Sequence, residues 1–156
     1  MRLENYGFLV INFQSRSYYR KILTNTIKLG NKMSYINKRN EYIYVNGEKI
    51  AYRELNKGKL EVPLVMLVHL AATMDNWDPK FIDLVAEKHH IIVLDLPGVG
   101  GSEGKVATSI PGMAQQAIDI ISELGYSKIN LLGLSMGGMI VQEIARLAND
   151  LVEKLK

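Results

Sequence analysis

The stretch Gly133-Leu134-Ser135-Met136-Gly137-Gly138 joins an apolar run to a segment with helical spacing, and the rest of the chain can be interpreted from this transition. The apolar run, residues 128–134, has the pattern of a strand buried on both faces, as central parallel strands usually are. A helix is expected from Met136 to about Ala148. Small residues flank Ser135 because a strand that turns at once into a helix crowds the neighbours of the turn residue. We therefore predict a sharp strand-to-helix turn that presents the Ser135 hydroxyl.

The pattern G-x-S-x-G around Ser135 resembles the nucleophile elbow of the α/β-hydrolase family. The resemblance implies that Ser135 is the catalytic nucleophile and that Gly133 and Gly137 are structural residues beside it. The free N–H groups at the start of the following helix would face the site, where they can stabilise a developing negative oxygen. The alternative is a tight turn in another doubly wound sheet, which would carry no nucleophile.

Residues 64–68 form a second continuous apolar run, as expected of a central parallel strand, and they lead into His69-Leu70-Ala71. In the family this position usually reads His-Gly-x and supplies one backbone N–H to the oxyanion hole, while the residue after the nucleophile supplies the other. The resemblance therefore assigns the two donors to Ala71 and Met136. Leu70 stands in place of the usual glycine, which makes a positive φ less accessible there.

His69 and Asp95 each have a structural and a catalytic interpretation. His69 either braces the oxyanion loop by hydrogen bonding, as the resemblance implies, or acts as a general base within hydrogen-bond reach of Ser135. Asp95 ends a third apolar strand, residues 90–95, and opens a turn over residues 96–102 that is similar to the family's D-x-x-G-x-G-x-S turn. We interpret both residues as structural.

A glycine-rich turn after a strand also suggests nucleotide binding, but neither nucleotide template fits. The pattern G-x-G-x-x-G starting at Gly98 would need glycine where Glu103 stands, and a phosphate loop ending at Gly104-Lys105 would need glycine at Val99. His89-His90 point to opposite faces of the expected strand, and no nearby spacing completes a metal site. We therefore expect neither a cofactor nor a metal.

The remaining pattern sets the fold class. Two strand-like segments, residues 41–45 and 49–54, are joined by Asn46-Gly47, the strongest short-range signal for a β-hairpin. Helices are expected from Pro79 and over residues 109–124. Strands and helices then alternate up to the elbow, so we predict an α/β fold with a mostly parallel sheet and an N-terminal antiparallel hairpin.

Charge is distributed unevenly over the 156 residues, whose net charge is +3. Residues 1–40 hold eight Lys or Arg and one Glu, whereas residues 41–156 hold eleven Lys or Arg and fifteen acidic residues. The mildly acidic part is the expected domain, so we expect no nucleic-acid partner. The absence of cysteine excludes disulfides, thiolate zinc sites and cysteine nucleophiles.

We interpret residues 1–40 as a basic extension outside the fold, disordered or weakly helical, with a targeting or membrane-touching segment as the alternative. Its apolar run, residues 6–13, is too short to span a membrane and is followed by no cleavage pattern of small residues, so we expect a cytoplasmic protein without stable membrane insertion. Met33 is a hypothetical alternative start.

The resemblance covers about Tyr42 to Lys156, the N-terminal half of such a domain, with the core truncated after the elbow helix. In the family a catalytic acid and then a histidine follow the nucleophile, but no histidine follows His90 here. Residues 151–156 look like the start of a further strand.

What the resemblance implies is a serine esterase or amidase, similar to the haloperoxidase-like branch, that acts on a small-molecule ester or amide. Its turnover would be impaired, because a serine without its base is a weak nucleophile. The alternative is a non-catalytic fragment that binds a complementing chain. Such a fragment could also associate with itself, if the strand at 128–134 lacks a neighbour and leaves an open sheet edge.

Overall fold

The computed structural model describes residues 34–59 and 61–155. The strands are β1 (Glu41–Val45), β2 (Glu48–Leu55), β3 (Leu64–Leu67), β4 (Ile91–Leu94), β5 (Ile129–Gly133) and β6 (Val152–Leu155). The α-helices are α2 (Pro79–Ala86), α3 (Ile110–Glu123) and α4 (Met136–Leu147), and two short 3₁₀ turns are η2 (Tyr35–Asn37) and η3 (Met74–Asn76). No helix among these is long and apolar enough to cross a membrane.

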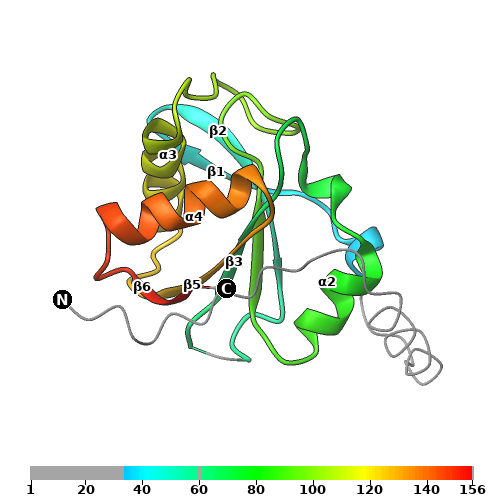
Figure 1. The fold of residues 1–156 in the computed structure, drawn as a ribbon. Coiled ribbons are helices and arrows are strands. Elements are labelled where there is room, and N and C mark those ends of the chain that lie inside the picture. Colours follow the sequence, from blue (N-terminus) through cyan, green and yellow to red (C-terminus); the bar gives the residue numbers. More distant parts are fainter. Residues whose placement is uncertain (1–33, 60, 156) are drawn as a thin grey trace.

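The six strands form one mixed sheet in the order β1-β2-β4-β3-β5-β6. The pairs β1/β2 and β2/β4 are antiparallel, and the pairs from β4 through β3 and β5 to β6 are parallel. Figure 1 shows α3 and α4 on one face of this sheet and α2 on the other. The predicted α/β fold with a mostly parallel sheet and an N-terminal antiparallel hairpin is therefore confirmed.

The hairpin turn follows from its two central residues. Asn46 and Gly47 have φ values of 52° and 85°, the left-handed region that a two-residue turn of this kind requires. The turn sets the register that pairs Val45 with Glu48 and Tyr42 with Ala51.

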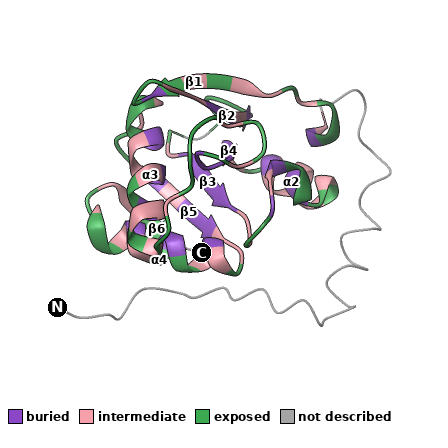
Figure 2. Ribbon diagram, turned by 90° about the horizontal axis from the view of Figure 1, so that it is seen from above, coloured by how far each residue is buried: buried purple, intermediate pink, exposed green. Residues whose placement is uncertain are grey.

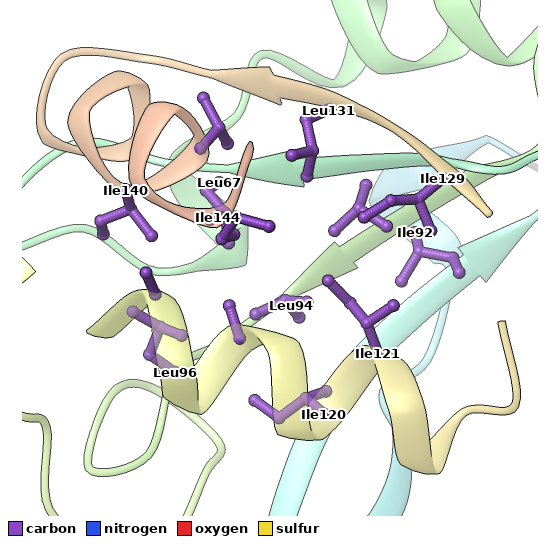
Figure 3. Close-up of a cluster of buried hydrophobic side chains, with 14 of the residues drawn as sticks. Leu67, Ile92, Leu94, Leu96, Ile120, Ile121, Ile129, Leu131, Ile140 and Ile144 are labelled. Atoms are coloured by element: carbon purple, nitrogen blue, oxygen red, sulfur yellow. The ribbon is translucent and has the colours of Figure 1, made fainter. Parts of the chain in front are cut away.

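The core consists of two apolar layers, one on each face of the sheet. The layer beneath α3 and α4 is shown in Figure 3, where Ile120 and Ile121 of α3 and Ile140 and Ile144 of α4 lie over the central strands. The other layer lies beneath α2 and includes Tyr35 and Trp77. The inner strands β3 and β4 contribute to both layers, and each of their residues is buried, which Figure 2 shows as purple ribbon. This explains why these strands are continuous apolar runs in the sequence.

Within the extension predicted for residues 1–40, Ser34 and Tyr35 contact the domain that begins at residue 41. Tyr35 is only 1% exposed, and its backbone N–H donates to Asp83 Oδ1 at 2.7 Å. Ser34 Oγ donates to the other oxygen of the same carboxylate at 2.5 Å. The periodicity of the sequence cannot reveal these contacts, because the residues that they join lie almost fifty positions apart. The Met33 hypothesis and the rest of the predicted extension lie outside the described residues.

The expectation that the strand at 128–134 lacks a neighbour is wrong. It is β5, and it pairs with β3 on one side and with β6 on the other. The sheet therefore continues one strand beyond the elbow helix, and β6 ends the order of the described strands. Leu151, Val152 and Leu155 are only partly buried there.

A buried polar cluster lies where β2 ends and β4 begins. Glu54 Oε1 accepts hydrogen bonds from His90 Nε2 at 2.7 Å and from the Tyr126 hydroxyl at 2.5 Å. Glu54 is 9% exposed and His90 is 2% exposed. Burial by itself raises the pKa of Glu54, but the hydrogen bonds from Tyr126, His90 and Lys57, together with the charge of Lys57, outweigh it and hold this pKa below its usual value. His90, predicted as a strand-end residue, thus has a buried carboxylate partner.

Candidate active site

The parallel strands end together at one edge of the sheet, which we call the carboxyl edge. Leu67, the last residue of β3, is in register with Gly133, the last residue of β5, and the Leu134 N–H donates to the Leu67 carbonyl at 3.0 Å. From this edge β3 leads to α2 on one face, whereas β5 leads to α4 on the other (Figure 1). Neighbouring strands whose connections diverge in this way open a crevice in which α/β proteins bind ligands.

Ser135 lies on the turn between β5 and α4, at this point of divergence. Its φ and ψ are 56° and −117°, a conformation that a residue with a side chain rarely adopts and that costs about 1–3 kcal/mol. Ser135 is the N-cap of α4, yet its side chain makes no capping hydrogen bond, and the residue is exposed. The turn thus holds a free hydroxyl at the carboxyl edge.

The two glycines flanking Ser135 allow α4 to begin directly against the strands. A Cβ on Gly133 would lie 2.3 Å from the Gly137 carbonyl oxygen, and a Cβ on Gly137 would lie 2.2 Å from the Leu67 carbonyl oxygen. Neither position has room for any side chain. The crowding anticipated from the sequence is therefore a backbone-to-backbone contact.

The second element of the site is the loop over residues 69–77, which follows β3. Ala71 is exposed and has a φ of 58°. The resemblance puts glycine, and with it a positive φ, at position 70, whereas the structure has the positive φ one residue later. Leu70 is 66% exposed, and its carbonyl lies 2.9 Å from His69 Nδ1. One nitrogen of the His69 ring is thus engaged with its own loop.

Two backbone N–H groups are candidates to hold an anion beside Ser135. Met136 is the first residue of α4, so its N–H has no acceptor one turn earlier in the helix. The helix dipole adds partial positive charge at this end. Ala71 belongs to the neighbouring loop at the same edge, four residues beyond Leu67. The fold thus brings the predicted nucleophile and both predicted donors to one edge of the sheet, on connections of adjacent strands.

Asp95 lies behind the 69–77 loop and links it to the turn after β4. The carboxylate is 3% exposed and accepts from the Met74 N–H at 2.8 Å and from the Gly101 N–H at 3.0 Å. Ser102 closes the same turn, because its hydroxyl donates to the Asp95 carbonyl at 2.8 Å and accepts from the Ala51 N–H at 2.9 Å. Burial raises the pKa of Asp95, against the lowering effect of these N–H donors. Both of its oxygens are occupied by backbone groups within the fold.

Tyr35 and Arg53 also contact the 69–77 loop, and the sequence analysis missed both. The Tyr35 hydroxyl donates to the Met74 carbonyl at 2.6 Å, and Arg53 pairs with Asp75 at 2.7 Å. These partners lie 39 and 22 positions apart, so neither periodicity nor a short motif could reveal them. The sequence signal for Tyr35 is weak, because it is one of two apolar residues, with Ile36, in a short polar stretch before the first strand.

The described residues include neither a histidine after Ser135 nor a cluster that could bind a metal ion. The three histidines of the chain are His69, His89 and His90, and none follows Ser135. Within residues 34–59 and 61–155, no three His, Asp or Glu side chains are grouped so that they could hold a metal ion.

Comparison with known proteins assigns the chain to a family. Residues 63–155 match the family model described as alpha/beta hydrolase fold. The chain is similar to esterase YbfF of Escherichia coli (strain K12), with 33% identity over 93 residues that cover 60% of this chain and 36% of that protein. It is also similar to a soluble epoxide hydrolase of Corynebacterium sp. (strain C12), with 33% identity over 113 residues that cover 71% of this chain and 38% of that protein.

Among solved structures, an alpha/beta hydrolase fold protein from Chitinophaga pinensis superposes with a TM-score of 0.76 at 33% identity, over 79% of this chain and 44% of that one. The chain thus spans less than half the length of each of these three relatives. The segment matched by the family model makes up more than half of the chain and runs from the start of β3 to β6, including the Ser135 turn. The chain belongs to the alpha/beta hydrolase fold family.

Proposed function

We propose that the chain carries the nucleophile half of a serine hydrolase site that acts on an ester or amide of a small molecule. Ser135 Oγ attacks the acyl carbonyl, and the N–H groups of Met136 and Ala71 hold the negative oxygen that develops. The observation that carries this proposal is the strained and exposed conformation of Ser135 at the start of α4. Strain of this kind persists where the surrounding structure holds a group ready for reaction.

An acyl substrate fits this site better than an epoxide, although one relative is named an epoxide hydrolase. A pair of backbone N–H groups beside a hydroxyl nucleophile matches the tetrahedral oxyanion of acyl transfer. The relative from Escherichia coli is named an esterase, which agrees with this choice.

In the chain alone, acylation of Ser135 should be slow and the turnover rate should be low. A serine hydroxyl needs a base to accept its proton, and no histidine follows Ser135. Loss of triad members typically costs about 10⁴ to 10⁶ in turnover and leaves what the oxyanion hole and binding supply. His69 is assigned a bracing role, since its Nδ1 already faces the Leu70 carbonyl. Asp95 is likewise structural, because backbone donors occupy both of its oxygens.

Hydrolysis of a short p-nitrophenyl ester by the purified chain and by Ser135→Ala tests this function. We expect slow release of p-nitrophenol by the wild type, with the acyl group found on the tryptic peptide that carries Ser135, and neither signal from Ser135→Ala. His69→Asn serves as a second variant and should retain acylation. Equal rates in wild type and Ser135→Ala would refute the proposed nucleophile, and loss of acylation in His69→Asn would assign the base to His69.

A second candidate function is a non-catalytic chain that pairs with a complementing chain along β6. The observation that favours it is that β6 pairs only with β5 among the described strands, while its Val152 and Leu155 are only partly buried. An unpaired strand edge beside apolar side chains is a template for strand addition. The intact mass of the protein from its native cells, measured with its state of association, separates the two candidates. A mass near 17.6 kDa, found in a complex with another chain, favours this second function. A larger mass favours a longer chain that also carries the missing acid and histidine.

Neither candidate requires a cofactor, a nucleic acid or a membrane, and we propose a cytoplasmic location for both. Fluorescence microscopy of the tagged full chain, with and without residues 1–33, tests this location. Recruitment to a membrane or organelle that depends on residues 1–33 would overturn it.

A further inference from the structure

The segment before β1 contacts the loop that carries Ala71, and Tyr35 makes the central contact. Tyr35 is 1% exposed, and its hydroxyl donates to the Met74 carbonyl at 2.6 Å. The N–H of the same Met74 donates to Asp95 Oδ1 at 2.8 Å. Met74 is therefore held through both of its backbone polar groups, by elements that precede and follow it in the sequence.

Arg53 strengthens this contact from the neighbouring strand. Its guanidinium lies 5.1 Å from the centre of the Tyr35 ring and pairs with Asp75 at 2.7 Å, and its Nε donates to Asn40 Oδ1 at 2.8 Å. The arginine thus joins two residues that precede β1, Tyr35 and Asn40, to the residue after Met74. Such an arrangement of a planar cation between a ring and a carboxylate is geometrically specific.

The remaining internal contacts make the end of this loop rigid. Thr73 and Asn76 form a reciprocal capping box around η3, in which the Thr73 N–H donates to Asn76 Oδ1 at 2.8 Å. Trp77 is 6% exposed and stacks on Phe81 of α2 at a centroid distance of 6.0 Å. Ala71 lies only three residues before Met74. A shift of Met74, which these contacts hold in place, therefore moves the Ala71 N–H.

We propose that Tyr35 is a positioning residue, which sets the place of the 69–77 loop and thereby of the Ala71 N–H at the candidate active site. The inference rests on the proposed function for its catalytic consequence and on the contacts above for the placement of the loop. Burial raises the pKa of Tyr35 to about 12, so the hydroxyl remains a hydrogen-bond donor at every pH at which the fold is tested. Errors of about 1 Å in such placement can cost a hundredfold in rate, so a single hydrogen bond at this point matters for chemistry.

Removal of the hydroxyl alone tests this role in the full chain. Tyr35→Phe keeps the ring in the core and its contact with Arg53, and Tyr44→Phe is the matched control, because Tyr44 is 66% exposed on β1. Hydrogen exchange of the amides in residues 69–77 should become about fivefold faster in Tyr35→Phe, as expected for the loss of one hydrogen bond, and remain unchanged in Tyr44→Phe. The rate of Ser135 acylation should fall several-fold at an unchanged half-saturating ester concentration.

A role limited to docking residues 34–40 gives a different result. Exchange would then increase only in residues 34–40, the 69–77 loop and the acylation rate would remain as in the wild type, and the proposal would be overturned. Absence of Ser135 acylation in the wild type would refute the proposed function, and exchange of the loop would still decide the role of Tyr35. If Tyr35→Phe does not fold, Arg53→Lys provides the test, since it keeps the charge but loses the planar contact with Tyr35 and Asp75.

Discussion

Gly137 of α4 lies directly against the end of β3, so that a Cβ at this position would be 2.2 Å from the carbonyl oxygen of Leu67. No side chain can be accommodated at that distance, and the neighbouring atoms are backbone that cannot rotate away. The closeness of α4 and β3 is what brings the Ser135 turn next to the 69–77 loop.

The first prediction concerns this contact. Gly137→Ala should destabilise the fold by about 3 kcal/mol or more, because the helix must move off the sheet to admit one methyl group. Gly138→Ala is the matched control, since its Cβ would meet nothing closer than the Gly133 carbonyl oxygen at 3.4 Å, and alanine favours a helix over glycine. Urea unfolding of the two variants measures the difference. Similar midpoints would contradict the steric argument.

A second prediction concerns the link between the two loops behind the site. Asp95→Asn should lower stability by about 1–2 kcal/mol, because an amide can accept from only one of the Met74 and Gly101 N–H groups and leaves the other unsatisfied. Burial of the Asp95 carboxylate disfavours its charge and raises its pKa, so removal of the charge offsets part of this loss. Thermal unfolding compares the variant with Asp150→Asn, an exposed site where no change is expected. An Asp95→Asn protein as stable as the wild type would mean that burial of the charge costs as much as the lost hydrogen bond.

The parts of the fold that local chemistry determines were predictable from the sequence. Asn46-Gly47 specifies a two-residue hairpin by its tolerance of positive φ, and Ser109 caps α3 by accepting from the Gly112 N–H, where the helix was expected to begin. The apolar runs before Ser135 and His69 are the parallel strands β5 and β3, as continuous apolar runs predict. The position of Ser135 follows from the same patterns.

Contacts between distant segments were not predictable in this way. Glu54 meets His90 across 36 positions and Tyr126 across 72, and nothing near any one of them in the sequence indicates the other two. The contact between Tyr35 and Met74 was not predictable for the same reason. The start of a strand predicted at residues 151–156 is β6, but its pairing with β5 was not predictable, because it joins segments separated by the whole of α4.

The Glu54 cluster gives a prediction for pH dependence. The pKa of Glu54 lies below its ordinary value of 4.5, so the folded state favours the ionised carboxylate. Its contribution to stability is therefore present above about pH 4.5 and is lost as the pH falls through the lower pKa of the folded state. Glu54→Gln should lower stability near neutral pH by about 1–2 kcal/mol, and the difference from the wild type should shrink below pH 4. Urea unfolding over a pH series measures this difference, and a gap that stays constant down to pH 3 would contradict the assignment.

The strain at Ser135 gives the last prediction, and it is independent of catalysis. With φ at 56° and ψ at −117°, Ser135 adopts a conformation that glycine reaches without cost and that any residue with a Cβ reaches only at about 1–3 kcal/mol. Ser135→Gly should therefore be more stable than the wild type, whereas Ser135→Ala, which keeps the Cβ, should have the wild-type stability because the Ser135 side chain makes no capping hydrogen bond. The comparison of these two variants separates strain from loss of the hydroxyl, since both lack the nucleophile. A Ser135→Gly protein no more stable than Ser135→Ala would mean that the turn relaxes in solution, and the argument that Ser135 is held ready for attack would lose its support.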